Sequence, residues 1–136
     1  MSHVRLSSRF ALGFAVLAPL LVSACPFRHA SSPATPHIDR ADPDSVVVPR
    51  GSVVEVALIG HDFAPGATGA NTIQFAGMSI PSVPSTAHGD TIHFVIPDMI
   101  VRGGEGPPVA LESGTFTVRV TTAAGTSNGV DIRVYR

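Results

Sequence analysis

Histidines are the residues of this 136-residue chain whose type most readily holds a metal ion. His88 and His93 stand close together with Asp90 between them, and zinc uses these residue types. Their spacing, however, places His88 in a turn and His93 on the outer face of an expected strand. The other four histidines are scattered: His3, His29, His37 and His61. Because zinc needs three or four ligands that converge at about 2 Å, the sequence predicts no zinc site.

Grouped carboxylates offer a second possible chemistry. Asp39, Asp42 and Asp44 could contribute to a calcium site, since hard cations take clustered carboxylates. They lack the Asp-x-Asp-x-Asp-Gly loop with a distal Glu, and Asp-Pro segments commonly begin turns. No serine stands in Gly-x-Ser-x-Gly, and the glycine-rich run 103–106 has no lysine and precedes no expected helix. We therefore expect no metal, no cofactor and no enzymatic activity.

The thiol of Cys25 follows a segment typical of an export signal. Arg5 and Arg9 precede an apolar run at 10–22, and the first acidic residue is Asp39. A run of this length matches the hydrophobic part of a secretory signal and is shorter than the roughly 20 residues of a membrane-spanning helix. A short anchor that is never cut is the alternative interpretation.

Residues 21–25, Leu-Val-Ser-Ala-Cys, resemble the lipobox of bacterial lipoproteins, in which small residues precede an obligatory cysteine. The resemblance implies a diacylglyceryl group and further acylation on Cys25, with residues 1–24 removed as a signal peptide. Cys25 is the only cysteine, so an internal disulfide is excluded. Without lipid, the thiol would stay free or form an intermolecular disulfide.

The expected mature chain divides into a tether and one domain. Residues 25–36 are rich in Pro, Ser and Ala, which is typical of a flexible tether that reaches roughly 30 Å at most. Residues 25–136 carry seven Arg, no Lys and ten acidic residues, a net charge of −3 with neutral His. This balance lacks the basic footprint of a nucleic-acid-binding protein, so we expect no nucleic-acid partner.

Residues 37–136 predict an all-β domain, because short runs of Val, Ile, Thr and Phe alternate with Gly, Pro, Asn and Asp. The clearest strands are expected at 53–59, 72–76, 91–96, 115–121 and 130–135. Weaker strands within 38–48 and at 78–80 bring the total to about seven, enough for a two-sheet sandwich. The longest break, at 97–113, is either a disordered insertion or a binding loop.

The order of these features resembles the IPT/TIG domain, an immunoglobulin-like (E-set type) fold shared by plexins and transcription factors, over residues 38–136. The matching positions are Ile38 with Pro43, Gly60 with Phe63, Phe75 with Gly77, residues 95–97, and the closing run from Gly114 to Gly125, Ser127 and Asn128.

Each matching position also has a physical interpretation. Gly60 and Gly77 suit turns with positive φ, and Phe63 can plug the core. The side chains of Ser127 and Asn128 can bond the backbone of the turn before the last strand, and Asn128 also tolerates the left-handed region.

Together these features predict a lipid-anchored, non-catalytic immunoglobulin-like module of a bacterial cell envelope. It would lie on the periplasmic face of the outer membrane or on the cell surface, with the inner membrane as the alternative. The expected function is contact with an envelope protein through sheet faces or edges. An accessory carbohydrate-binding module is the competing hypothesis, but the chain has no Trp and a single Tyr, Tyr135, for an aromatic platform.

Overall fold

The computed structural model describes residues 34–101, 103 and 106–136, and it shows an all-β domain, as predicted. Cys25, the expected signal peptide and most of the expected tether lie outside the described residues. Within the described ranges, no helix is long and apolar enough to cross a membrane. The strands are β1 (His37–Asp42), β2 (Ser45–Val47), β3 (Val53–His61), β4 (Gly66–Phe75), β5 (Met78–Ser85), β6 (Thr91–Pro97), β7 (Met99–Ile100), β8 (Val109–Ala110), β9 (Gly114–Thr122), β10 (Gly125–Thr126) and β11 (Val130–Tyr135).

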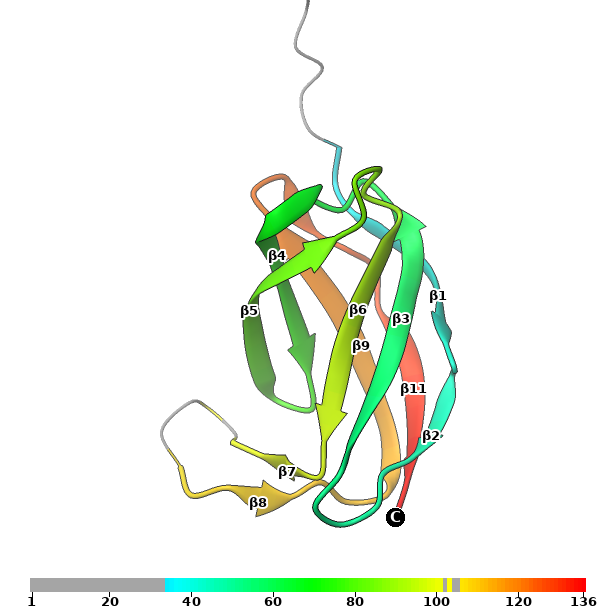
Figure 1. Ribbon diagram of the computed structural model, residues 1–136, viewed down its shortest axis with the longest axis vertical. Coiled ribbons are helices and arrows are strands. Elements are labelled where there is room, and N and C mark those ends of the chain that lie inside the picture. The colour runs from blue at the N-terminus through cyan, green and yellow to red at the C-terminus, as the bar shows by residue number, and fades with distance from the viewer. Residues whose placement is uncertain (1–33, 102, 104–105) are drawn as a thin grey trace, which may run out of the picture. The chain divides into compact units, whose positions relative to one another are not determined.

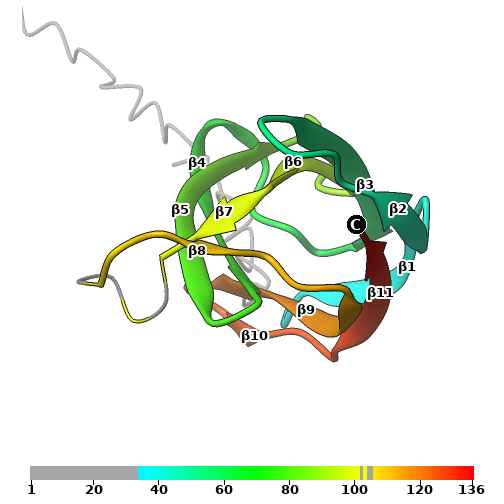
Figure 2. The ribbon, with the colours of Figure 1, turned by 90° about the horizontal axis from the view of Figure 1, so that it is seen from below.

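One large sheet holds most of these strands, in the order β1-β3-β6-β5-β4-β9-β11-β2, with β10 paired to β9. The sheet folds back on itself at β5, which pairs along its length with β4 but meets β6 through the single pair Ser85↔Ile92. Its two halves, β1-β3-β6 and β5-β4-β9-β11-β2, therefore enclose a common interior, as the view along the strands shows (Figure 2). This arrangement is consistent with a β-sandwich.

The first two strands lie at opposite ends of this strand order. β1 pairs antiparallel with β3, whereas β2 pairs in parallel with β11. Only Pro43 and Asp44 separate the two strands, and Pro43 follows a cis peptide bond. The chain thus passes from one half of the sheet to the other within a few residues, and β1 and β2 descend the same side of the domain (Figure 1).

The core contains the side chains that the period-two patterns place inward. In β6 the three alternating positions are buried, and most of the corresponding positions of β3, β4, β9 and β11 are buried with them, whereas Val54, Phe116 and Val130 are partly buried. Phe75 packs its ring against Phe94 and Phe116, with ring centroids 5.9 and 5.5 Å apart. The largest fully buried side chains include Ile38, Leu58, Ile73, Phe75, Ile92, Ile96, Ile100, Leu111 and Ile132.

The break expected at 97–113 is more structured than the sequence indicates. β7 and β8 pair within it as a small second sheet, and Ile100 and Leu111 are fully buried. The backbone N–H of Leu111 donates to the carbonyl of Asp98, 2.8 Å away. Each of these strands has only two residues, too few to show a period of two, and the run between them is rich in glycine and proline. The two ends of this segment belong to the fold.

The folded domain also begins slightly before its expected start. Pro36, which we expected to belong to the tether, is buried. The hydroxyl of Thr35 donates to the carbonyl of Ala124, 3.4 Å away. The last residues of the expected tether therefore pack on the domain.

Candidate functional site

The register of β1 and β3 brings two distant histidines together. His37 begins β1 and His61 ends β3, and the antiparallel pairing sets them directly opposite each other. Their rings stack with centroids 5.1 Å apart and an interplanar angle of 25°. Both side chains are exposed.

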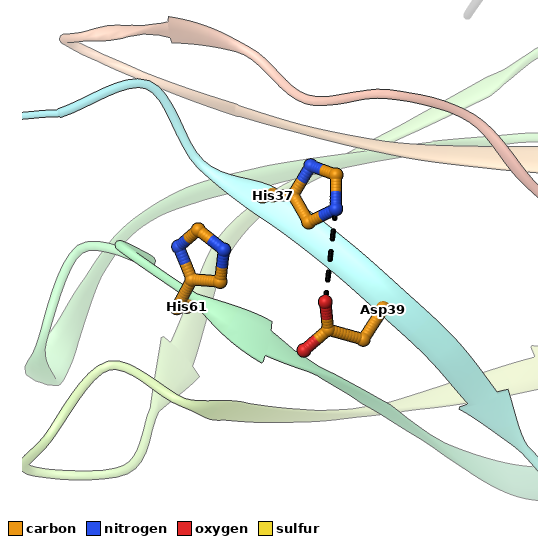
Figure 3. Close-up of side chains that lie close together, drawn as sticks. All are labelled: His37, Asp39 and His61. Atoms are coloured by element: carbon orange, nitrogen blue, oxygen red, sulfur yellow. Dashed lines mark ion pairs between the residues drawn. The ribbon is translucent and has the colours of Figure 1, made fainter.

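A β-bulge adds a carboxylate to this pair. The register shifts between Ile38 and Arg40, so Asp39 has no partner residue in β3. Bulges commonly redirect a side chain, and here Asp39 Oδ1 lies 3.6 Å from His37 Nε2. His37, Asp39 and His61 each offer a ligand atom, and these atoms lie within 4.8 Å of one another (Figure 3). We call these three residues the histidine cluster.

A second carboxylate orients one of the two rings. His61 Nδ1 lies 2.7 Å from Asp62 Oδ2. With the proton on Nδ1, the ring donates to this carboxylate and keeps a free lone pair on Nε2. Asp62 has φ 61°, in the left-handed region that non-glycine residues seldom adopt. Such backbone conformations persist where the surrounding structure enforces them, often at functional sites.

Gly60 allows β1 and β3 to approach closely at the histidine cluster. A Cβ on Gly60 would lie 2.0 Å from the carbonyl oxygen of His37, well inside any permitted contact. The expectation that Gly60 adopts a positive φ is wrong, since positive φ in this region occurs at Asp62 instead. The glycine is required for space rather than for backbone conformation.

Asn128 fixes β1 from the other side. Its side-chain oxygen accepts from the N–H of Ile38, and its side-chain nitrogen donates to the carbonyl of Ile38, both at 2.8 Å. We expected this side chain to bond its own turn, and its actual partner lies 90 residues away in the chain. Since Ile38 stands between His37 and Asp39, Asn128 fixes the backbone of two members of the histidine cluster.

Ser127 bonds the turn before the last strand. Its hydroxyl accepts from the N–H of Val120 at 2.9 Å and donates to the carbonyl of Asn128 at 2.7 Å. Its own N–H donates to the carbonyl of Val120 at 2.8 Å. These bonds present the Asn128 side chain to β1.

The remaining positions singled out in the sequence shape the scaffold. Phe63 is 2% exposed, and its N–H donates to the carbonyl of Gly89 at 3.0 Å. Gly77 has φ 82° in the two-residue turn between β4 and β5. Gly125 has φ 138° and lies against Thr35, whereas Gly114 begins β9, where an added Cβ would make only an ordinary contact with the Phe116 ring. None of these four residues is a member of the histidine cluster.

The two histidines considered for zinc from the sequence, His88 and His93, belong to no group of three metal-binding side chains in the described ranges, and of the three calcium candidates only Asp39 belongs to one. His93 Nδ1 lies 2.7 Å from Glu55 Oε1 on the outer face of β3 and β6, and His88 lies in a turn. In the described part of the chain, the histidine cluster is the one group of three metal-binding side chains. Sequence reasoning missed it because His37 stands beside the expected tether, at the first residue of the expected domain, and 24 positions before His61. The histidine cluster could have been predicted only from the antiparallel pairing of 37–42 with 53–61, which sets His37 opposite His61.

A loop next to the histidine cluster holds the end of β3. The N–H of Gly60 donates to the carbonyl of Asp90 at 2.9 Å. The pKa of Asp90 lies below its ordinary value of 3.8, chiefly because the Thr86 hydroxyl donates to its carboxylate. Thr91 and the charge of His88 lower this pKa further, whereas desolvation opposes the shift.

A second exposed feature lies where β5 and β6 separate. Beyond Ser85↔Ile92, the described strands pair with β6 on its β3 side alone, so its opposite edge is open. A groove of about 350 Å³ runs along this edge, between Pro84 of β5 and Val95 of β6. Val53 and Val95 are 63% and 49% exposed on the adjoining outer face. We call this region the open β6 edge.

No protein-family model matches the chain, and no curated protein matches it.

Proposed function

We propose that this chain is a lipid-anchored, non-catalytic module of the bacterial cell envelope with an immunoglobulin-like, E-set type fold. Support for the fold type comes from the strand order and from the split of the first strand between β1 and β2, which pair with β3 and β11. Further support comes from the spacing of Gly60, Phe63, Gly77 and Asn128, which resembles the IPT/TIG pattern.

The open β6 edge carries the proposed function, which is contact with an extended segment of an envelope protein. An added strand would pair with the open backbone groups of β6, and main-chain hydrogen bonds of this kind supply affinity. Pockets for alternate side chains supply specificity. The groove beside Pro84 and the exposed side chain of Val95 provide such contacts.

A photo-crosslinking amino acid at position 95 tests this proposal in the full chain within its native envelope. We expect one dominant protein adduct at position 95. The matched control is position 117, because Thr117 is exposed on β9, in the other half of the sheet. Equal labelling from both positions would contradict the proposal, and strong, selective hits on a glycan array would favour the carbohydrate-binding alternative.

The proposed anchoring rests on Cys25 and the segment before it. Mass spectrometry of the purified chain should find an amino terminus at Cys25 that carries diacylglyceryl and acyl groups. Cys25→Ser should move the protein from the membrane fraction to the soluble fraction, because a serine cannot form the thioether. An unmodified thiol together with an intact amino terminus would overturn this part of the proposal.

A further inference from the structure

We propose that the histidine cluster, His37, Asp39 and His61, binds a divalent transition-metal ion of the zinc class. Two imidazole nitrogens and one carboxylate oxygen form a ligand set that zinc uses widely. Three protein ligands leave the remaining coordination position to water or to a donor from another molecule. This site is separate from the open β6 edge, and it replaces the expectation that the histidines hold no metal.

The donor atoms are close enough for small side-chain movements to complete the site. They lie within 4.8 Å of one another. A tetrahedral ion with bonds of about 2.0–2.1 Å holds its donors roughly 3.3 Å apart. The side chains of His37, Asp39 and His61 are exposed, so rotations about their side-chain torsions can close this difference without moving the core.

The backbone beneath these side chains is already fixed. Asn128 holds both polar backbone groups of Ile38 at 2.8 Å, and Gly60 permits the close approach of β1. The bulge at Asp39 turns a carboxylate toward the two rings. Binding would therefore order three side chains and no backbone segment, which limits its entropic cost.

Asp62 supplies the carboxylate to which a metal-binding histidine usually donates its second ring N–H. A ligating histidine commonly donates its second ring N–H to a carboxylate, which fixes the tautomer and raises the basicity of the ligating nitrogen. Asp62 Oδ2 lies 2.7 Å from His61 Nδ1, in the position that this role requires. The carboxylates of Asp39 and Asp62 also offset the charge of the ion.

The test is a titration of the untagged full chain, in detergent and stripped of metal, with Zn²⁺ in competition with a chromophoric chelator. We expect saturable binding to this site. His37→Ala and His61→Ala should each abolish it, since each removes a ligand. Asp62→Asn should weaken it roughly 10–100-fold, the usual effect of losing such an outer carboxylate.

His93→Ala is the matched control, because His93 is also exposed and paired with a carboxylate at 2.7 Å. His93→Ala should leave the affinity of the histidine cluster for Zn²⁺ unchanged. Circular dichroism would establish that each variant keeps the β fold, and X-ray absorption should show nitrogen and oxygen neighbours at about 2.0–2.1 Å. The proposal is overturned if saturable binding is absent, if it survives unchanged in either His37→Ala or His61→Ala, or if His93→Ala removes it equally.

Discussion

Two places on the outer side of β3 join a histidine to a carboxylate, and they differ in what surrounds them. Near the start of the strand, Glu55 Oε1 lies 2.7 Å from Nδ1 of His93 in β6. At its end, His61 meets His37 of β1, and Asp39 and Asp62 lie close by. The first place is a simple exposed pair, whereas the second gathers four groups that can bind or support a metal ion.

The difference comes from the regularity of the two strand pairings. β3 and β6 stay in register from Val53↔Pro97 to Ile59↔Thr91, so Glu55 lies directly opposite Val95 and reaches His93 on the diagonal. β1 and β3 lose register at Asp39, and the chain leaves β3 through the left-handed residue Asp62. A regular pairing brings outward side chains together two at a time. Where a bulge or a left-handed residue interrupts the pairing, more than two side chains can converge.

Gly60→Ala should have the largest effect, because it removes the close approach on which the histidine cluster depends. The added Cβ would lie 2.0 Å from the carbonyl oxygen of His37, so β1 must shift. We expect a loss of about 3 kcal/mol in the free energy of unfolding, measured by urea denaturation. Gly114→Ala is the control, since its Cβ would meet only the Phe116 ring at 3.7 Å. Equal losses in the two variants would refute this account of Gly60.

Asn128→Ala should have the next largest effect, because it releases β1 without creating a clash. It removes both hydrogen bonds to Ile38, which are partly buried. We expect a loss of about 1–2 kcal/mol in the free energy of unfolding, and faster amide hydrogen exchange at Ile38. Thr126→Ala, which removes an exposed bond to Thr121, should cost less than about 0.5 kcal/mol. Unchanged exchange at Ile38 would show that β1 does not depend on Asn128.

Val95→His would test whether the Glu55–His93 pair fails to bind zinc only because it lacks a third donor. Val95 lies opposite Glu55 and two residues from His93, on the same outer face. We expect the variant to bind a second zinc ion, detected by the chelator titration described above. Val53→His is the control, because Val53 lies opposite Pro97, further along the strands from His93. A second ion bound by neither variant, or by both, would show that the number of nearby donors is not decisive.

The smallest effect should come from Asp90, whose loop holds the end of β3. Its pKa is lowered, so its contribution to stability is present above the ordinary value of 3.8 and is lost as the pH falls through the lower folded-state value. The difference in urea midpoint between the wild type and Asp90→Asn should therefore shrink as the pH falls below 3.8. Thr86→Val should remove the same pH-dependent contribution to stability, because the Thr86 hydroxyl is the main cause of the lowered pKa of Asp90. A difference that does not vary with pH would contradict this.

The strands were the most predictable part of the molecule. The five segments with clear alternation correspond to β3, β4, β6, β9 and β11, because burial on one face leaves a period of two in the sequence. The total strand count was underestimated because β2, β7, β8 and β10 have only two or three residues each. Strands this short are too brief to show a period.

The histidine cluster could not be predicted because its parts meet only through long-range pairing. His37 and His61 are 24 positions apart in the sequence, and no local pattern connects them. The bulge at Asp39 depends on the packing of β1 against β3, which no local pattern reveals. Gly60 and Asn128 were singled out from the sequence, but their physical roles became clear only from what they touch.

The parallel pairing of β2 with β11 has a mechanical consequence. Its register, Arg133↔Ser45 to Tyr135↔Val47, joins a segment near the start of the domain to one at its end. The C-terminus lies at the opposite end of the domain from the start of β1 (Figure 1). Tension applied between the two ends would therefore load these hydrogen bonds in shear, so that they share the force and fail together rather than one after another. We expect the domain to resist stretching along this direction with a single, sharp rupture.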